Sequence, residues 1–495
     1  MNINPVLRKP LTDEEVKEQR KVWDKIDTKI QYDGRVIILP AHPHNMPLDK
    51  AIEALQRLQK DEEQPYQVHE IFDAYPHDAA VAFVKAMQKL YGFASFETEI
   101  HKSFFGDIKE PPMMLSVKTG IGANDFVLVP MGQLRLPGVK DPIKTQFYRR
   151  DNKSPTVFLV HGTVKKRDRH IVLELANETR QILKSESIYR GKPLRIKVGD
   201  EGELDMNNPP EFLDVREIRE EHLFFDQDVH DQITTSILVP IRHANECRQR
   251  GIQAKRTVVL SGPFGTGKSL TGRLVAKEGE DNGWTYILLD KVQGLKAALE
   301  FAGRYAPAIV FAEDIERTAG SERTDKVNEL INIVDGVVSK TSQVMTVLTT
   351  NYLEQINRAM LRPGRLDAVI AIRAPGPKTA ERIIRFYAGE LLADNADLIG
   401  AGLQLKGQIP ATIREAVDRA KLGMIGRRDS KLVDHDIVIA GQTMQTQLDA
   451  LNKDAKPESS ADTLARSLSE VVNGNDDPRL KAMTKVLEEI KDHVS

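Results

Sequence analysis

The sequence predicts an α/β protein whose centre is a parallel, five-stranded sheet covered by helices on both faces. Three observations predict this. Five short apolar runs alternate with helical patterns between residues 213 and 373, as in strand–helix–strand units. A glycine-rich loop, Gly262–Ser269, separates the first run from a segment rich in helix formers. The third run ends in two adjacent carboxylates, Glu313 and Asp314.

Each expected strand is a run of strand length that is rich in β-branched and apolar residues. The runs are Thr257–Ser261, Thr285–Asp290, Ala308–Ala312, Val344–Thr349 and Val369–Ile372. After the glycine loop, Leu270–Lys277 contains helix formers and little that would break a helix. The sequence therefore predicts the order strand, glycine loop, helix.

Two modules of different character are expected before this sheet. Residues 1–112 have mostly helical patterns, so a helical module is predicted there. Residues 113–212 contain apolar runs between Gly, Pro and Asn turns, which indicates a β-rich α+β module. Its last strand is expected at Leu194–Val198, before a turn-rich boundary at Gly199–Pro210.

Helical patterns return after the sheet. Residues 374–451 are predicted to form a small helical subdomain, which we call the lid. Residues 452–495 are predicted to form a linker and a C-terminal amphipathic helix with an apolar stripe. The stripe favours docking on the protein's own domain over binding of a partner.

Composition limits the classes of function. The chain has 495 residues, a net charge of −2 and a sequence pI of about 6.7, which argues against a surface built throughout to bind nucleic acid. Its single cysteine, Cys247, excludes an intramolecular disulfide framework and fits a reducing compartment. No apolar run has spanning length, and Met1–Arg20 is polar and charged, so we expect a soluble, cytoplasmic protein without membrane contact.

The glycine loop carries the clearest chemistry. It fits the phosphate-binding pattern G-x-x-x-x-G-K-[ST] at every required position, with Gly262, Pro263, Phe264, Gly265, Thr266, Gly267, Lys268 and Ser269. Backbone N–H groups of such a loop curl around phosphates at the positive end of a helix. Lys268 is expected to reach the β- and γ-phosphates, and the Ser269 hydroxyl to ligate Mg²⁺. ATP and Mg²⁺ are therefore the expected ligands.

The adjacent carboxylates suggest a second part of the same site. An apolar strand that delivers Glu313 and Asp314 beside a phosphate loop could hold Mg²⁺ with one acid and polarise the attacking water with the other. A solvated acidic turn would explain the pair if it stood alone. Glu316 is close enough in sequence to compete for either role.

Taken together, these motifs resemble those of the AAA family of ATPases over about residues 213–450. The loop matches the family's GPPGTGKT, with Phe264 in place of the second proline. Residues 307–316, PAIVFAEDIE, are similar to the family's PSIIFIDEID. Further similar segments are Asn328–Val337, Thr349–Asn351 and Asn357–Asp367, the last of which places Arg362 and Arg365 at the arginine-finger positions.

The resemblance implies a P-loop AAA+ core with a helical lid and a function for each matched residue. Glu313 would support the metal, Asp314 would activate water, and Asn351 would sense the γ-phosphate. Arg362 and Arg365 would act on the site of a neighbouring subunit, which implies a homo-oligomeric ring; the family forms hexamers. The implied activity is ATP hydrolysis that remodels a macromolecule, with a protein substrate or adaptor favoured.

The chain departs from the family at two places. The acidic pair is Glu-Asp rather than Asp-Glu, and a misplacement of about 1 Å at a reacting group can cost about 10²-fold in rate. The segment Asp290–Gly294 stands where polypeptide-threading members carry an aromatic pore residue, and it has none. Threading through a pore is therefore in doubt, whereas local remodelling or a partner-dependent motor stays open.

Two other functions remain open. The acidic order motivates a nucleotide-gated scaffold that hydrolyses ATP weakly. The basic run Val164–Arg169 motivates a motor on nucleic acid, although a solvated turn between strand and helix explains it better. By position, Phe225, Asp226 and Pro240 correspond to the family's adenine-flanking segment, and Gly407–Thr412 to the lid turn that contacts nucleotide.

Overall fold

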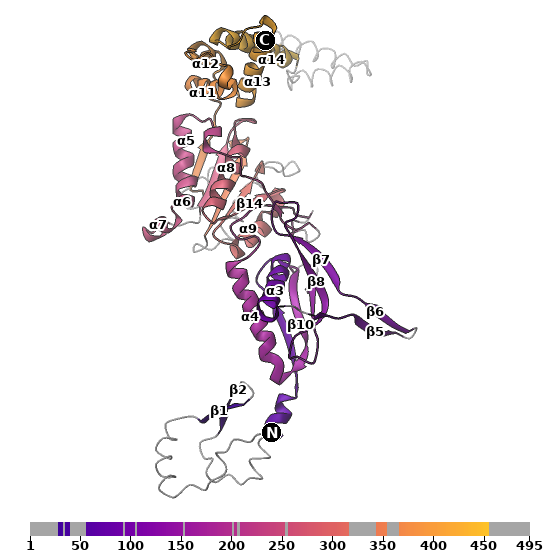
Figure 1. Cartoon of the computed structure of the whole chain (residues 1–495). Coiled ribbons are helices and arrows are strands. Elements are labelled where there is room, and N and C mark those ends of the chain that lie inside the picture. Colours follow the sequence, from indigo (N-terminus) through magenta and orange to yellow (C-terminus); the bar gives the residue numbers. More distant parts are fainter. Residues whose placement is uncertain are drawn as a thin grey trace, which may run out of the picture. The chain divides into compact units, whose positions relative to one another are not determined.

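The computed structural model describes most of the chain as two compact units (Figure 1). One unit comprises residues 1–117 and 127–186, and the other comprises residues 118–126 and 187–495. The described residues are 28–32, 35–39, 56–92, 95–103, 106–151, 154–199, 202–204, 208–252, 256–315, 343–353 and 366–454.

The first unit contains an antiparallel sheet. Its strands run in the order β3-β10-β9-β8-β4, and β7 also pairs with β8. Their bounds are β3 Pro65–Ile71, β4 Ser95–Phe96, β7 Met113–Lys118, β8 Phe126–Arg135, β9 Ile143–Tyr148 and β10 Val157–Lys165. Two short hairpins accompany it, β1 Thr28–Tyr32 with β2 Arg35–Leu39, and β5 Glu99–Ser103 with β6 Gly106–Glu110.

Two helices, α3 (Pro76–Tyr91) and α4 (Arg169–Ser185), contact each other and the sheet. The core lies between them and β10, where the ring of Phe158 is fully buried beside those of Phe72 and Phe83. The strands β1–β6 lie within residues 1–112, for which only a helical module was predicted. The pairing of β3 with β10 joins residues about ninety positions apart, and local patterns do not report such pairings.

The second unit contains a seven-stranded sheet in the order β12-β11-β14-β15-β16-β13-β17. All neighbours are parallel except β12, which is antiparallel to β11. Five of these strands confirm the predicted parallel core, each within one residue at either end: β13 Arg256–Ser261, β14 Thr285–Leu289, β15 Ala308–Ala312, β16 Val344–Thr350 and β17 Ala368–Ala371.

Two strands extend this core beyond the prediction. They are β11 (Pro193–Ile196) and β12 (Glu211–Phe212), and β11 is the strand assigned from sequence to the preceding β-rich module. The segment before β11 is docked on the same domain, because the Arg190 guanidinium donates to the carbonyls of Arg304 at 3.0 Å and Ala306 at 2.7 Å. The sheet domain therefore begins upstream of residue 213.

The helices of the sheet domain are α5 Gln227–Ile233, α6 Val239–Arg242, α7 Ala244–Gln249, α8 Lys268–Asp281 and α9 Leu295–Arg304, and a π-helical turn, η5 (Thr234–Leu238), joins α5 to α6. Helices α5, α6 and α8 contribute to one apolar cluster with the sheet, and α9 contacts β14, β15 and β16. Gly272 lets α8 approach β15 closely, since a Cβ there would lie 2.5 Å from the Phe311 ring.

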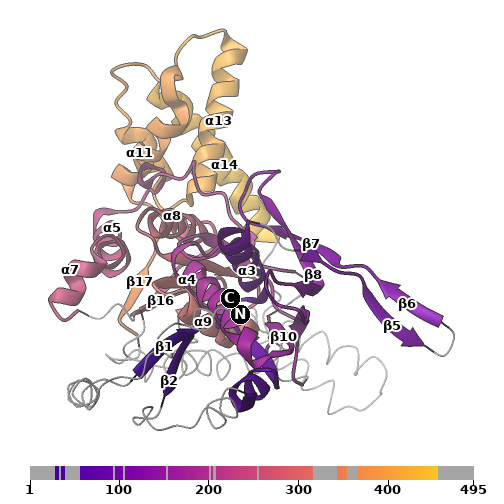
Figure 2. The same cartoon turned by 60° about the horizontal axis from the view of Figure 1, so that its bottom comes forward.

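The lid consists of α11 Pro377–Ala388, α12 Ile399–Leu405, α13 Pro410–Arg427 and α14 Asp434–Asp454 (Figure 2). Prolines at the first position of α11 and α13 fit helix starts, where no N–H is needed. Buried side chains from all four helices form one cluster, which includes Ile383, Leu405, Val417 and Ile437. No helix among the described residues has the length and apolar character needed to cross a membrane.

Candidate nucleotide site

The phosphate loop connects the carboxyl end of β13 to the first residue of α8. Gly267 caps α8 with a left-handed backbone, φ 108°, and Gly265 has φ 76°. At Gly262, φ is 156° and a Cβ would lie 2.1 Å from the carbonyl oxygen of Ile372. These glycines are therefore required by the shape of the loop, and the predicted order strand, loop, helix is present.

The ammonium group of Lys268 is held by hydrogen bonds to the loop and to Asn351. Its side chain is buried, and Nζ donates to the carbonyl oxygens of Gly262 at 2.6 Å and Pro263 at 2.8 Å and to Asn351 Oδ1 at 2.8 Å. The Thr266 hydroxyl donates to the Pro263 carbonyl at 2.8 Å, which fixes the turn of the loop. Ser269, at the start of α8, is exposed.

Asp314 and Asn351 meet at the carboxyl ends of two neighbouring parallel strands, β15 and β16. Asn351 Nδ2 donates to Asp314 Oδ1 at 3.2 Å, and the Asp314 backbone N–H donates to the Thr349 hydroxyl at 2.9 Å. Asp314 has a left-handed backbone, φ 46°, a conformation in which Asp is more frequent than most residues. The structure thus brings Lys268, Asn351 and Asp314 into one hydrogen-bonded chain.

Glu313 precedes Asp314 at the same strand end and is half-buried. Burial and, after it, the charge of Glu313 raise the pKa of the Tyr286 phenol on β14. Ser269 and Glu313 are oxygen donors of the kind that Mg²⁺ takes. The described residues hold no cluster of three His, Cys, Asp or Glu side chains that could hold a metal ion.

In the sequence, Phe264 was identified as a residue of the phosphate loop and as a departure from the family's proline. Its ring is 60% exposed, and its centroid lies 5.8 Å from Lys268 Nζ. This distance is within the range of a cation–π contact. The apolar character of Phe264 and its place beside Lys268 were the available signals for this contact.

Two segments that correspond to family segments only by their position in the sequence lie against the phosphate loop. The Phe225 ring would be 3.2 Å from a Cβ at Gly267, and Ile409 Cδ1 would be 2.7 Å from a Cβ at Gly265. Asp226 carries a lid contact that the sequence did not reveal: its carboxylate accepts from Gly376 N at 3.1 Å and the Thr379 hydroxyl at 2.5 Å. Pro240 is buried in the first turn of α6.

The segment Asp290–Gly294 stands at the position of the family's pore residue. It is held in place by packing against the domain. Val292–Gly294 forms a 3₁₀ turn, η6, in which Val292 is buried. A Cβ on Gly294 would lie 2.3 Å from Val198 Cγ1, so this turn fits tightly against the segment that follows β11. Asp290, Lys291 and Gln293 are its exposed side chains.

Several predicted site residues lie outside the described residues. They are Arg362, Arg365, Glu316 and the segment Asn328–Val337. Asp367, the last residue of the segment that contains the two arginines, is described: its carboxylate accepts from Thr257 N at 2.7 Å, and its N–H donates to the Thr257 carbonyl at 2.9 Å. This end of the segment is thereby fixed to β13, the strand that leads into the phosphate loop.

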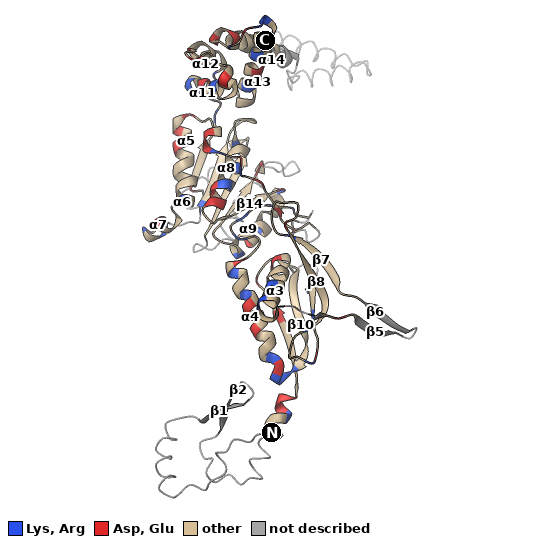
Figure 3. Cartoon of the chain, in the orientation of Figure 1, with Lys and Arg blue, Asp and Glu red and all other residues tan. Residues whose placement is uncertain are grey.

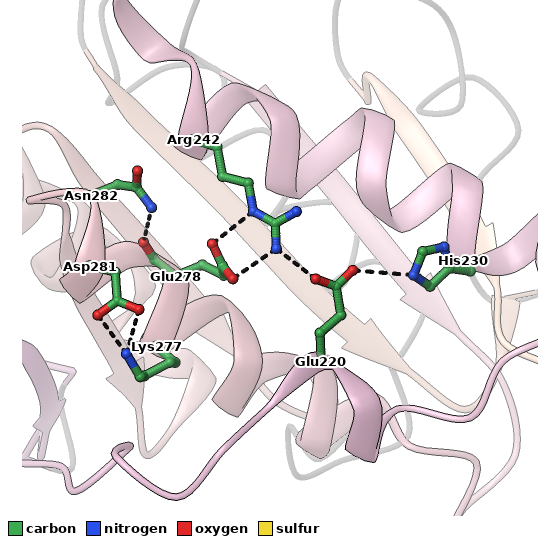
Figure 4. A network of polar contacts seen from close by, with 7 residues as sticks. All are labelled: Glu220, His230, Arg242, Lys277, Glu278, Asp281 and Asn282. Atoms are coloured by element: carbon green, nitrogen blue, oxygen red, sulfur yellow. Dashed lines mark hydrogen bonds and ion pairs between the residues drawn. The ribbon is translucent and has the colours of Figure 1, made fainter.

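A polar network holds α8 to the helices beside it (Figure 4). Arg242 on α6 donates twice to Glu278 on α8, at 2.8 Å, and once to Glu220, also at 2.8 Å. The Glu278 and Glu220 carboxylates raise the pKa of Arg242, and Arg242 lowers that of Glu220. His230 Nε2 lies 3.2 Å from Glu220. The network fixes the helix whose first turn carries Lys268.

Comparison with known proteins agrees with this geometry. Residues 258–374 match the family model described as ATPase family associated with various cellular activities (AAA). The chain is 28% identical to a putative ribosome biogenesis ATPase nvl of Dictyostelium discoideum over 39% of this chain and 25% of that protein. It is 32% identical to the ATP-dependent zinc metalloprotease FtsH of Thermus thermophilus, over 39% of this chain and 34% of that protein.

The chain thus spans 25% and 34% of the lengths of these two relatives. The matched residues contain the phosphate loop, the acidic pair and Asn351, which the structure places at one edge of the sheet. Residues 258–374 are therefore an AAA ATPase domain, and domains of this family hydrolyse ATP.

Proposed function

We propose that this protein assembles into a homo-oligomeric ring, a hexamer as in its family, and couples ATP hydrolysis at subunit interfaces to the remodelling of a protein substrate. The observation that carries the proposal is the hydrogen-bonded chain Lys268–Asn351–Asp314 at the mouth of the phosphate loop. It places a cation for phosphate, an amide and a carboxylate within a few ångströms of one another. Phosphoryl transfer depends on such positioning and electrostatic stabilisation.

The residues act as follows in this proposal. Backbone N–H groups of Gly262–Ser269 and the Lys268 ammonium bind the phosphates. Ser269 and Glu313 hold Mg²⁺, which neutralises charge on the phosphates when bound. Asp314 orients and deprotonates the attacking water, and Asn351 orients the γ-phosphate. Arg362 and Arg365 serve the site of the neighbouring subunit, where an arginine finger can be worth about 10³–10⁵ in rate.

Remodelling without aromatic threading is favoured by the segment at the pore position. Val292 is buried and Gly294 is wedged against Val198, so this turn offers polar side chains rather than an aromatic grip. Local remodelling of a bound protein or complex fits such a surface better than pulling an extended chain by stacking. A protein adaptor that supplies the grip is the second form of the same proposal.

A motor on nucleic acid is less well supported. Most cations of the basic run that motivated it are paired within the first unit: Lys165 and Arg167 pair with Glu63, and Lys166 pairs with Asp61 at 2.5 Å. Both basic and acidic residues lie along α4, which follows the run (Figure 3). Cations that are already paired release fewer counterions from a phosphate backbone.

The names of the relatives suggest two settings, ribosome biogenesis and proteolysis. Because the family model matches the nucleotide domain, we carry over the ATPase and leave the zinc-protease activity with that relative. The first unit is then the part that selects the substrate. With a single cysteine and no spanning helix among the described residues, we propose that the protein works in the cytoplasm.

ATP turnover measured across a series of protein concentrations tests the proposal. In a ring with trans arginines, turnover per subunit rises with concentration and collapses in Arg365→Ala. Concentration-independent turnover that survives this substitution would remove the ring. Absence of turnover in the wild type, with ATP still bound, would favour the nucleotide-gated scaffold.

A further inference from the structure

The segment between the 3₁₀ turn η4 (Glu220–His222) and α5 is extended, with φ −95° and ψ 115° at Leu223 and φ −63° and ψ 154° at Asp226. Leu223 and Phe225 are each 4% exposed and belong to the apolar cluster of the sheet domain. Phe224, which lies between them, packs against the apolar cluster of the lid. Successive side chains of an extended chain point to opposite sides. Residues 223–226, which we call the strap, therefore have one side on each subdomain.

One face of the lid helix α11 receives the lid side of the strap. The hydroxyl of Thr379, which is 4% exposed, donates to Asp226 Oδ1 at 2.5 Å. One turn further along, the Arg382 guanidinium lies 5.8 Å from the centroid of the Phe224 ring, within the range of a cation–π contact. After another turn, the Phe386 ring meets that of Phe224 at a centroid distance of 5.2 Å. Steps of three and four residues place these side chains on one face of the helix.

Asp226 also caps α11 from outside the helix. Gly376 is the N-cap of α11, and no side chain at that position binds the first N–H groups. The Asp226 carboxylate accepts from the Gly376 N–H at 3.1 Å and so places a negative charge at the positive end of this helix. The positions of the strap and of α11 are therefore tied by hydrogen bonds to a charged group as well as by apolar packing.

The opposite side of the strap reaches the phosphate loop. The Phe225 ring lies so close to Gly267 that a Cβ there would be 3.2 Å from Phe225 Cε1. Gly267, with φ 108°, caps α8, and the next residue is Lys268. Because protein interiors are packed as closely as organic crystals, a displaced ring moves its neighbours. A shift of Phe225 would therefore move the backbone at the start of α8, the part of such a loop whose N–H groups bind phosphate.

We propose that the strap couples the lid to the phosphate loop, with Phe225 as a positioning residue for the start of α8. In this coupling, α11 fixes Asp226 and Phe224. These two residues fix Phe225 in turn, and Phe225 fixes Gly267. A change in the position of α11 then alters how tightly the loop binds the phosphates of a nucleotide. The inference rests on nucleotide binding by the loop, as proposed above, and adds a route by which the lid controls that binding.

A double-mutant cycle in the full-length protein tests this route. Thr379→Val removes the hydroxyl that holds Asp226 and keeps the size of the side chain, whereas Phe225→Leu removes the ring that meets Gly267. Because a hydrogen bond to a charged group is lost, we expect Thr379→Val to weaken binding of a fluorescent ADP analogue about three- to tenfold. In the Phe225→Leu background the same change should alter the Kd by less than about twofold, because the route is already interrupted.

Hydrogen exchange gives a second measurement that needs no nucleotide. Thr379→Val should speed exchange of the amides of residues 268–272, in the first turns of α8, by about threefold or more, because a loosened strap lets this end open more often. Phe224→Leu removes the ring on the lid side of the strap and should act in the same direction; it takes the place of Thr379→Val if that variant does not fold. Thr443→Val is the matched control, because Thr443 is exposed on α14 and donates to the Ile439 carbonyl of its own helix at 2.9 Å. It should match the wild type in both measurements.

Each contrary result overturns the inference. Equal weakening by Thr379→Val in both backgrounds would mean that the lid acts on the loop by another route, such as the contact of Ile409 with Gly265. A loss of thermal stability in Thr379→Val with unchanged ADP affinity and unchanged exchange in α8 would mean that the strap only supports the fold. Absence of ADP binding in the wild type would remove the proposed ATPase site, and the exchange of α8 would then decide alone whether the strap couples the lid to the loop.

Discussion

The two larger sheets of this protein have different strand arrangements, and among the described residues the parallel one brings charged and polar side chains together at one edge. In the second unit, β13, β15 and β16 are parallel, so the loops after them emerge at one edge and bring Lys268, Asp314 and Asn351 together. In the first unit the strands alternate in direction, so successive loops leave at opposite edges. Its buried ionisable side chains, such as His77, lie inside the core instead.

This difference predicts which substitutions should alter function and which should alter stability. Carboxyl ends of parallel strands are the usual place for ligands in α/β sheets. Changes at that edge should alter turnover with little effect on folding, whereas changes to buried polar groups of the first unit should alter folding. The predictions below test this division.

Substitution of Asp314 should have the largest effect. A positioned general base contributes about 10²–10⁴ in rate, so Asp314→Asn should lower ATP turnover by about that factor. ADP binding should persist, because the asparagine side chain can still accept the hydrogen bond from Asn351. Turnover and ADP affinity of the same preparation are the measurements.

Glu313→Gln serves as the partner variant, since Glu313 is the other acid at this strand end. Its turnover should fall mainly through loss of Mg²⁺ support, and added Mg²⁺ should partly restore it. If the wild type hydrolyses ATP no faster than both variants, the acidic pair has no catalytic function. The nucleotide-gated scaffold would then be the favoured interpretation.

Acid should destabilise the first unit through His77. Burial lowers the pKa of His77 from 6.5 to about 4, while its ring lies between those of Tyr75 and Phe147. Between pH 6.5 and 4 the unfolded chain binds a proton that the folded unit does not, so stability is present above pH 6.5 and falls as the pH is lowered. The loss should reach about 3 kcal/mol near pH 4.

Hydrogen exchange of α3 in the full-length protein, measured at pH 7 and pH 5, reports this loss. In His77→Gln the extra acid sensitivity of α3 should disappear. Equal sensitivity in both proteins would assign the acid effect to other groups.

How much of this could be predicted from the sequence differs between the two sheets. Strands β13–β17 are apolar runs next to helical patterns, so their positions followed from local residues. The order of motifs predicted that Lys268 and Asn351 serve the same phosphates, but the hydrogen bond between them was not predicted. In contrast, β11 appeared to end a different module, because its docking depends on Arg190 reaching carbonyls more than a hundred residues away.

Asp226 also shows that contacts between distant parts of the chain cannot be predicted from local sequence. An aspartate just before a helix is the usual N-cap, and Asp226 does precede α5. Its carboxylate makes no such cap and instead accepts from Gly376 and Thr379 on the lid. Sequence pattern gave the position of the residue but could not give the direction of its side chain.

Replacing Arg242 should show how much more a partly buried ion pair contributes to stability than an exposed one. Arg242 is 30% exposed and holds both Glu278 and Glu220, so Arg242→Met should leave two carboxylates facing each other at a cost of about 2 kcal/mol. Arg216→Met is the matched control, because Arg216 forms a similar pair with Asp214 but is 72% exposed. Thermal unfolding should show a clear loss in the first variant and little or none in the second.

The smallest predicted effect tests whether the lid belongs to the site or only adjoins it. Asp226 joins the first helix of the lid to the segment whose Phe225 supports Gly267, and the lid residue Ile409 lies against Gly265. Asp226→Ala should release this end of the lid and weaken ADP binding by about tenfold, since hydrogen bonds to charged groups are worth about 1.5–3 kcal/mol and part of this is regained from water. Asp226→Asn keeps an Oδ1 acceptor and should bind nearly as the wild type does, as should Asp228→Ala, which removes an exposed carboxylate on α5. If Asp226→Ala binds ADP normally, the lid contact is structural and the nucleotide site ends at the edge of the sheet.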